Sequence, residues 1–291
     1  MGRNTKKPRS RPPSDSTGGD GSHLSDGRLA EGGEGEERQP KRRTGPAIIH
    51  QDESLILISK PAGQRVDDGD EDTPSVLDSL TSRGTVEEGA ALEAVYPLDV
   101  GASGLLVLTR RPETRDRLRQ QIADGRMELR HLVLVRGRPG QEAGTISRPL
   151  FDPGADGSVV RPDEDRGQAA VTDWRLREFY VGFALLECIP RTTVRSQIRV
   201  HLQTAGMPLV VDPRYGGGSE LLLSSFKADY RASRRREERP LIARLTLHAQ
   251  SVRLAHPRTG AAMTFEAAMP KDMRATIHQL DRFGRVPSGS A

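Results

Sequence analysis

Apolar segments of strand length recur along the chain from about residue 47 to residue 265, separated by polar turns. The alternation predicts two strands around an acidic turn within residues 48–60. Further strands are predicted at residues 105–108, 129–135, 167–175, 183–189, 241–254 and 263–265. Helical spacing of apolar residues predicts helices at 73–83, 112–123, 197–205, 221–230 and 272–283. This irregular mixture indicates an α+β domain around one large mixed sheet.

The first 45 residues have a different composition from the rest of the chain. Beyond Met1, their only large apolar residues are Leu24 and Leu29, which are too few to offset the entropy of ordering the segment. We therefore expect a disordered low-complexity tail at 1–45, a folded domain at 46–283 and a flexible tail at 284–291. The basic clusters at 6–11 and 41–43 fit either RNA phosphate contact or a solubilising tail.

Composition excludes several functional classes. The 291 residues include 44 Lys and Arg against 40 Asp and Glu, a small excess that hints only weakly at a polyanionic partner. Cys188 is the single cysteine, so no disulfide forms within the chain and a cytoplasmic location is expected. No apolar run is long enough to span a membrane, and no His or Cys spacing predicts a metal site.

The segment 96–110 carries the clearest candidate chemistry, because Asp99 lies in a short polar loop that leads into an apolar strand. An acid at the start of a buried strand is held in place, which suits a reacting group. The same placement also suits an aspartate that stabilises a turn by bonding its own backbone. The local pattern leaves both interpretations open.

Four segments together resemble the RluA-type RNA pseudouridine synthases. The segment Tyr-Pro-Leu-Asp-Val-Gly-Ala-Ser-Gly-Leu-Leu at 96–106 is similar to the family's active-site motif, and Lys-Pro-Ala-Gly at 60–63 is similar to its early turn. Ser-Gln-Ile-Arg-Val-His-Leu at 196–202 resembles a family helix, and 208–216 resembles the Pro-Leu-Val-Gly-Asp-Pro-x-Tyr-Gly segment that follows it. Their order and spacing carry the resemblance over about residues 47–282.

The resemblance implies the pseudouridine synthase fold, with a large mixed, mostly antiparallel sheet flanked by helices and loops. It also implies an isomerase that needs no cofactor. The enzyme would detach uracil from its ribose, rotate the base and rejoin it through carbon, in either ribosomal or transfer RNA. Asp99 would be the catalytic nucleophile, acting either by adding to the sugar or by assisting elimination. We expect the protein to act as a monomer.

The chain departs from the family motifs at several of these positions. Tyr96 and Pro97 replace a His-Arg pair whose arginine helps to displace the target base, and His131 replaces an active-site tyrosine. Direct alignment places Val194 where the family has an arginine that pairs with the nucleophile, so Arg195 and Arg191 become the candidates for that partner. The catalytic candidates are therefore Asp99, His131 and Arg195.

Two functional hypotheses follow. The first is an active RNA pseudouridine synthase, and the alternative is a catalytically impaired relative that only binds RNA. A guanidinium within reach of Asp99 would favour the enzyme, because a cationic neighbour favours an ionised carboxylate. If Val194 instead fills the place of that guanidinium, the protein that only binds RNA would be favoured. Candidate RNA contacts are Lys60, Arg126, Arg130, Arg195, Gln197 and Arg199, although the charged ones also fit ordinary solvated surface.

Overall fold

The computed structural model describes residues 45–66, 74–86, 92–154, 159–231 and 236–286. The tails expected at 1–45 and 284–291 lie almost wholly outside these ranges. Strands within them are β1 Ala47–Gln51, β2 Leu55–Lys60, β3 Glu93–Ala94, β4 Ser103–Thr109, β5 Glu128–Arg136, β6 Ala143–Ser147, β7 Leu150–Phe151, β8 Arg161–Pro162, β9 Val171–Tyr180, β10 Phe183–Pro190, β11 Leu247–Ala255 and β12 Ala262–Glu266. The helices are α1 Val76–Thr81, α2 Pro112–Ala123, α3 Gln197–Thr204 and α4 Lys271–Phe283, with a short 3₁₀ turn, η1, at Leu223–Ser225.

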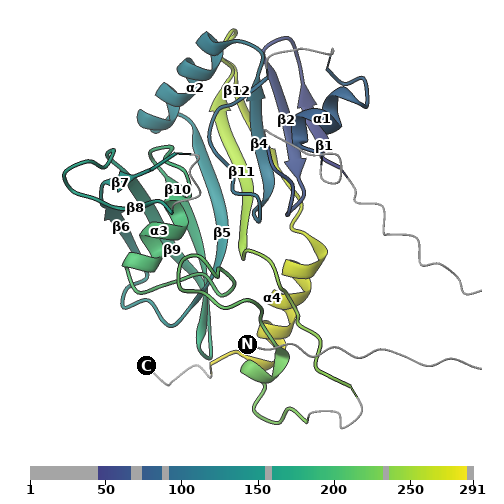
Figure 1. The fold of residues 1–291 in the computed structure, drawn as a ribbon, viewed down its shortest axis with the longest axis vertical. Coiled ribbons are helices and arrows are strands. Elements are labelled where there is room, and N and C mark those ends of the chain that lie inside the picture. Colours follow the sequence, from purple (N-terminus) through teal and green to yellow (C-terminus); the bar gives the residue numbers. More distant parts are fainter. Residues whose placement is uncertain (1–44, 67–73, 87–91, 155–158, 232–235, 287–291) are drawn as a thin grey trace, which may run out of the picture. The chain divides into compact units, whose positions relative to one another are not determined.

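One large sheet organises the described residues, with strands in the order β1-β2-β4-β11-β5-β10-β9-β6. β12 extends from β11, and β3 pairs with β4 (Figure 1). β4 and β11 run parallel, whereas the other neighbouring pairs described in this sheet are antiparallel. The α+β class and the large mixed, mostly antiparallel sheet are thus confirmed.

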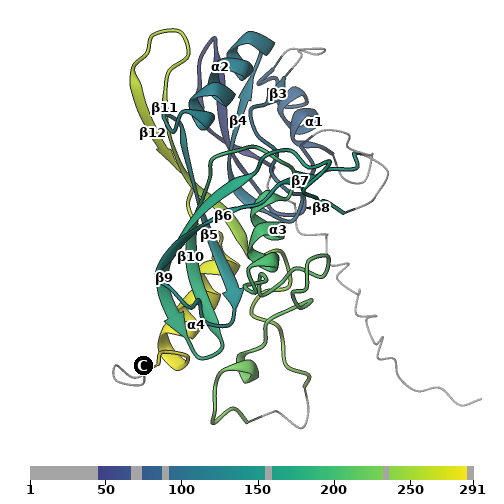
Figure 2. The same ribbon diagram turned by 90° about the vertical axis from the view of Figure 1, so that its left-hand side faces the viewer.

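The two faces of the sheet carry different helices. Val133 of β5 belongs to the same buried apolar cluster as residues of α1, α2 and α3. Leu132 and Leu134 lie in a second cluster, which includes Met273 and Leu280 of α4. Because successive side chains of a strand point to opposite faces, α1, α2 and α3 cover one face and α4 covers the other (Figure 2).

A glycine permits the parallel pairing at the centre of the sheet. Gly104 pairs with Ala249 of β11 and has φ +109°, a conformation that L side chains rarely adopt. A Cβ atom at Gly104 would lie 2.1 Å from the carbonyl oxygen of Ala249. The Ser-Gly of the predicted motif therefore lets β4 approach β11 closely directly after the Asp99 loop.

Most predicted elements appear within a few residues of their expected bounds, but two differ. The helix predicted at 221–230 is wrong, because only Leu223–Ser225 forms a 3₁₀ turn. Leu221 and Phe226 are instead buried in the apolar cluster around α4, a tertiary contact that outweighs local helical spacing. The strand predicted from residue 241 begins at Leu247. Cys188 is fully buried, as expected for a structural thiol.

Among the described residues, we find no helix that combines the length and apolar character needed to cross a membrane.

Candidate active site

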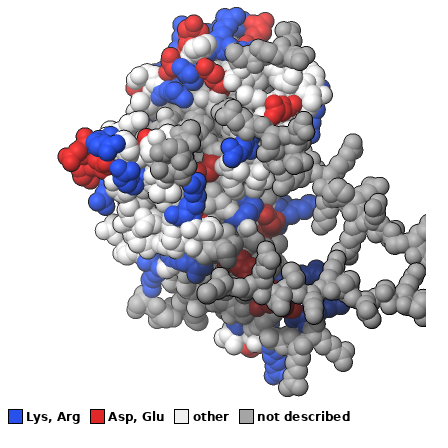
Figure 3. Space-filling model, viewed as in Figure 1, with Lys and Arg blue, Asp and Glu red and all other residues white. Residues whose placement is uncertain are grey.

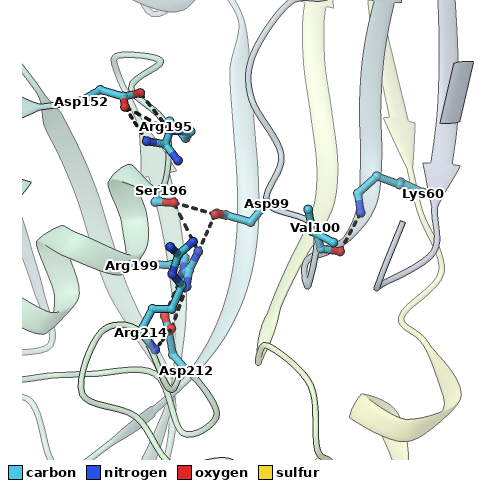
Figure 4. Close-up of polar contacts among 9 residues, drawn as sticks. All are labelled: Lys60, Asp99, Val100, Asp152, Arg195, Ser196, Arg199, Asp212 and Arg214. Atoms are coloured by element: carbon cyan, nitrogen blue, oxygen red, sulfur yellow. Dashed lines mark hydrogen bonds and ion pairs between the residues drawn. The ribbon is translucent and has the colours of Figure 1, made fainter. Parts of the chain in front are cut away.

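The loop that carries Asp99 joins β3 to β4 and is tied down on both sides. The buried Tyr96 donates its hydroxyl proton to the carbonyl of Leu105 at 2.7 Å, and the Ala102 amide donates to the carbonyl of Asp99 at 3.0 Å. The carbonyl of Val100 accepts hydrogen bonds from the Gly63 amide at 2.7 Å and from Lys60 Nζ at 3.1 Å (Figure 4). The Lys-Pro-Ala-Gly turn therefore holds the loop from outside the motif.

Lys60 is a buried cation whose ammonium group faces backbone oxygens. Its side chain is 1% exposed, and Nζ also donates to the carbonyls of Pro61 at 3.1 Å and Gln64 at 2.8 Å. Burial lowers the pKa of Lys60 to about 8, and the nearby charge of Asp99 opposes that shift. With a pKa of about 8, Lys60 stays mostly protonated at neutral pH, and its ammonium group donates to three carbonyl oxygens.

Asp99 pairs with Arg199 of α3. Arg199 Nη1 donates to Asp99 Oδ1 at 2.5 Å, and Nε and Nη2 form a two-pronged pair with Asp212 at 2.7 Å each. Side-chain exposure falls from 14% for Asp99 to 9% for Arg199 and 0% for Asp212. Burial alone would lower the pKa of Arg199, but the bonds to Asp212 and the charge of Asp99 outweigh it and raise that pKa. Arg199 is thus a fixed, permanently charged partner for Asp99.

Ser196 completes the contacts to Asp99. Its Oγ donates to Oδ1 at 2.6 Å, and its backbone has φ +54°, the left-handed conformation that is uncommon for a residue other than glycine. Ser196 precedes the first turn of α3, and residues three apart share one helix face, so Ser196 and Arg199 approach Asp99 together. Both side-chain hydrogen bonds that Asp99 accepts from described residues end on Oδ1. Oδ2 has no hydrogen-bond partner among these residues.

His131 lies on β5 in the pocket that Asp99 lines together with Tyr96, Pro97, Val194 and Ser196. It is 4% exposed, and its Nδ1 has no hydrogen-bond partner among the described residues. Burial and, to a smaller extent, the neighbouring His248 lower the pKa of His131 to about 4. The imidazole is therefore neutral at physiological pH. Beside it opens a larger pocket of about 550 Å³, lined by Asp99, Arg199 and Asp212.

Known proteins with similar sequences point to one family. The model of the RNA pseudouridylate synthase family matches residues 54–204. The chain belongs to the RNA pseudouridylate synthase family.

Comparisons with individual proteins agree with that assignment. The chain is 30% identical over 235 residues to the ribosomal large subunit pseudouridine synthase C of Salmonella typhi. The aligned region covers 80% of this chain and 69% of that relative. The Haemophilus influenzae protein of the same name is also 30% identical, with 80% and 68% covered. The human RNA pseudouridylate synthase domain containing 4 has the same fold, with a TM-score of 0.58 and 20% identity over 83% of this chain and 95% of that one. The protein is thus an RNA pseudouridine synthase, and its RluA-type assignment is confirmed.

The cation beside Asp99 in this synthase comes from a position that the sequence analysis did not assign to it. Arg195 points away and pairs with Asp152 at 2.6 Å, and Arg191 pairs with Asp173 at 2.7 Å. Both predictions of the partner were therefore wrong, because the left-handed turn at Ser196 directs the next turn of α3, not the preceding loop, toward Asp99. Val194 lines the pocket, but the cationic partner of Asp99 is not missing, because Arg199 supplies it.

Three predicted RNA contacts also need correction. Arg199 is buried between two carboxylates, and Lys60 is enclosed by carbonyls. Gln197 is 4% exposed, and its amide bonds Thr172, Thr192 and the backbone of Val171 and Val194. These three side chains bond other parts of the protein and thereby shape the site.

Two further predicted RNA contacts, Arg130 and Arg126, pair with acidic residues. Arg130 belongs to the face that α4 covers, where it pairs with Glu128 and Glu187, and Arg126 pairs with Asp124 at 2.7 Å. Their contact with RNA stays a prediction. Sequence reasoning missed Ser196 and Asp212 as site residues, although both stood inside quoted motif segments. The three-residue spacing from Ser196 to Arg199 was the available signal.

We predict that Arg199→Gln lowers the free energy of unfolding by about 3–5 kcal/mol, because it leaves the fully buried Asp212 without its charged partner. Urea denaturation measures the loss. The matched control is Arg195→Gln, whose pair with Asp152 is 38% and 22% exposed and should contribute about 1 kcal/mol or less. Equal losses in the two variants would contradict a buried role for the Arg199 pair.

We also predict a pH signature for Lys60. Its folded pKa of about 8 lies below the ordinary value of 10.5, so between these values the unfolded chain binds more protons than the folded one. Stability should therefore rise with pH, by about 2 kcal/mol between pH 8 and 10, relative to Lys60→Met. Chemical denaturation of both proteins across this range tests the difference. Parallel stability curves would show that Lys60 titrates normally.

Proposed function

We propose that Asp99 is the nucleophile of this pseudouridine synthase. The observation that carries the proposal is the buried pair between Arg199 and Asp99 Oδ1, because a fixed guanidinium holds the carboxylate in one orientation at the pocket, as a reacting group requires. Ser196 donates to the same oxygen, which leaves Oδ2 as the oxygen turned to substrate. This arrangement favours an active enzyme over a relative that only binds RNA.

The proposed reaction conserves every atom of the uridine. Oδ2 of Asp99 bonds C1′ of the ribose while the N1–C1′ bond breaks, and the electron pair leaves with the uracil. After the base turns, C5 bonds C1′ and the bond between C1′ and Oδ2 breaks. C5 then loses its proton and N1 gains one. The target base must first leave its stack, which costs a few kcal/mol.

His131 is the proposed contact to the turning base. Its ring is neutral, and the unbonded Nδ1 accepts or donates one hydrogen bond according to the tautomer. A uracil edge offers both carbonyl acceptors and an N–H donor, so it complements either form. Pro97, exposed at the rim of the same pocket, supplies an apolar surface for a neighbouring base rather than a charge.

We propose RNA of the large ribosomal subunit as the substrate, in preference to transfer RNA. The names of the relatives from Salmonella typhi and Haemophilus influenzae support this choice. We further propose that the protein acts as a monomer in the cytoplasm and without a metal ion.

Pseudouridine mapping tests the proposal. Total RNA is compared from cells with the gene intact, deleted, or restored as wild type, Asp99→Ala or Asp229→Ala. We expect one or more sites in large-subunit RNA to disappear on deletion and to stay absent with Asp99→Ala, which removes the nucleophile. Asp229→Ala should restore them, because that side chain is 86% exposed and its ion pair with Lys227 is long, at 4.0 Å.

The outcomes separate the parts of the proposal. Sites that vanish only from transfer RNA would overturn the substrate assignment and leave the nucleophile intact. Full restoration by Asp99→Ala would overturn the role of Asp99. No change in any RNA would favour the binding protein.

A further inference from the structure

A second hollow adjoins the Asp99 pocket and contains three arginines. It has a volume of about 580 Å³ and lies between α2 and the segment that precedes α3. Pro97, Thr193 and Val194 line both this hollow and the narrower pocket of Asp99 and His131. An RNA strand whose target nucleotide reaches Asp99 therefore has this hollow directly beside it, across Pro97.

The charges in the hollow are not fully paired. Arg195 is bonded by Asp152, and Arg115 is bonded by Glu93 at 2.7 Å and by Asp116 at 3.0 Å. Arg119 has no carboxylate partner among the described residues. Its Nε donates to the carbonyl of Val95 at 2.8 Å, and its two Nη groups bond none of the described residues.

The position of Arg119 on α2 adds to this imbalance. Arg115 and Arg119 are four residues apart, so they lie on one face of the helix, where like charges repel. An anion between them would replace that repulsion with attraction. On the face drawn in Figure 3, the blue side chains of the described residues lie in small groups, with white and red ones between them. The guanidinium of Arg119, which pairs with no carboxylate among the described residues, offers a local phosphate contact beside the active site.

We infer that this hollow binds a phosphate of the nucleotide next to the target uridine, with Arg119 as its principal donor. The inference rests on the proposed function for its ligand, a single-stranded RNA segment. A guanidinium with two free Nη groups matches two phosphate oxygens, which is why arginine recurs at phosphate contacts. Pro97 then separates the base that enters the Asp99 pocket from the phosphate held by Arg119.

The test compares arginines on the two sides of the same helix. Arg119→Gln, Arg119→Lys and Arg117→Gln are made in the full chain. Arg117 serves as the control because it faces away, toward the carbonyl of Pro257. The dissociation constant for a 15-nucleotide uridine-rich RNA is measured by fluorescence anisotropy at several salt concentrations. Unfolding curves check that each variant is folded.

We expect Arg119→Gln to raise the dissociation constant roughly fivefold at low salt and to reduce the salt slope by about 0.7, the value for one phosphate contact on a single strand. Arg119→Lys should keep the slope, because it keeps the charge, and Arg117→Gln should match wild type. If Arg119→Gln also matches wild type, or the wild type does not bind the RNA, the inference is wrong.

This experiment and the pseudouridine mapping can fail independently. If mapping finds no modified site but Arg119→Gln still reduces the salt slope, the phosphate contact stands and the proposed function fails. If the enzyme is active and the slope is unchanged, only the phosphate contact fails. With an active enzyme, Arg119→Gln should raise KM and leave kcat unchanged, because this contact is equally strong in the ground and transition states.

Discussion

The chain of charges from Asp212 through Arg199 to Asp99 is the interaction on which the rest of the site depends. Asp212 is fully buried, so its charge needs a partner, and Arg199 supplies one through two hydrogen bonds. This pairing fixes the guanidinium, whose remaining group then reaches Asp99. The segment that carries Asp212 is itself anchored on β5, since the Val210 amide donates to the carbonyl of Leu134 at 2.9 Å.

The large sheet brings the residues of this site together. The Asp99 loop enters β4, His131 extends from β5, and α3 packs over β9 and β10, so three parts of one sheet face meet at the acid. Lys60 and Gly63 hold the same loop through the carbonyl of Val100. Two buried cations therefore flank Asp99: Arg199 contacts its side chain, and Lys60 contacts the backbone of its loop.

Periodicity was enough to predict the fold class, because apolar alternation reports burial directly, and motif order pointed to the loop that carries Asp99, whose role as nucleophile stays a prediction. The partner of Asp99 could not be predicted in the same way. Its identity depends on the left-handed backbone of Ser196, and serine gives no local signal for that conformation. Lys60 and Gln197 appeared to be RNA contacts because polarity was taken as a sign of exposure. Their burial became visible only with the carbonyls and hydroxyls that surround them.

The most direct test of the account is whether Asp212 acts on turnover through Arg199. Single-turnover rates of pseudouridine formation would be measured for wild type, Asp212→Asn, Arg199→Lys and the double variant. The account predicts strong non-additivity, with Asp212→Asn costing little once Arg199 has been replaced. If the two losses multiply independently, Asp212 does not work by holding Arg199, and the central claim is contradicted.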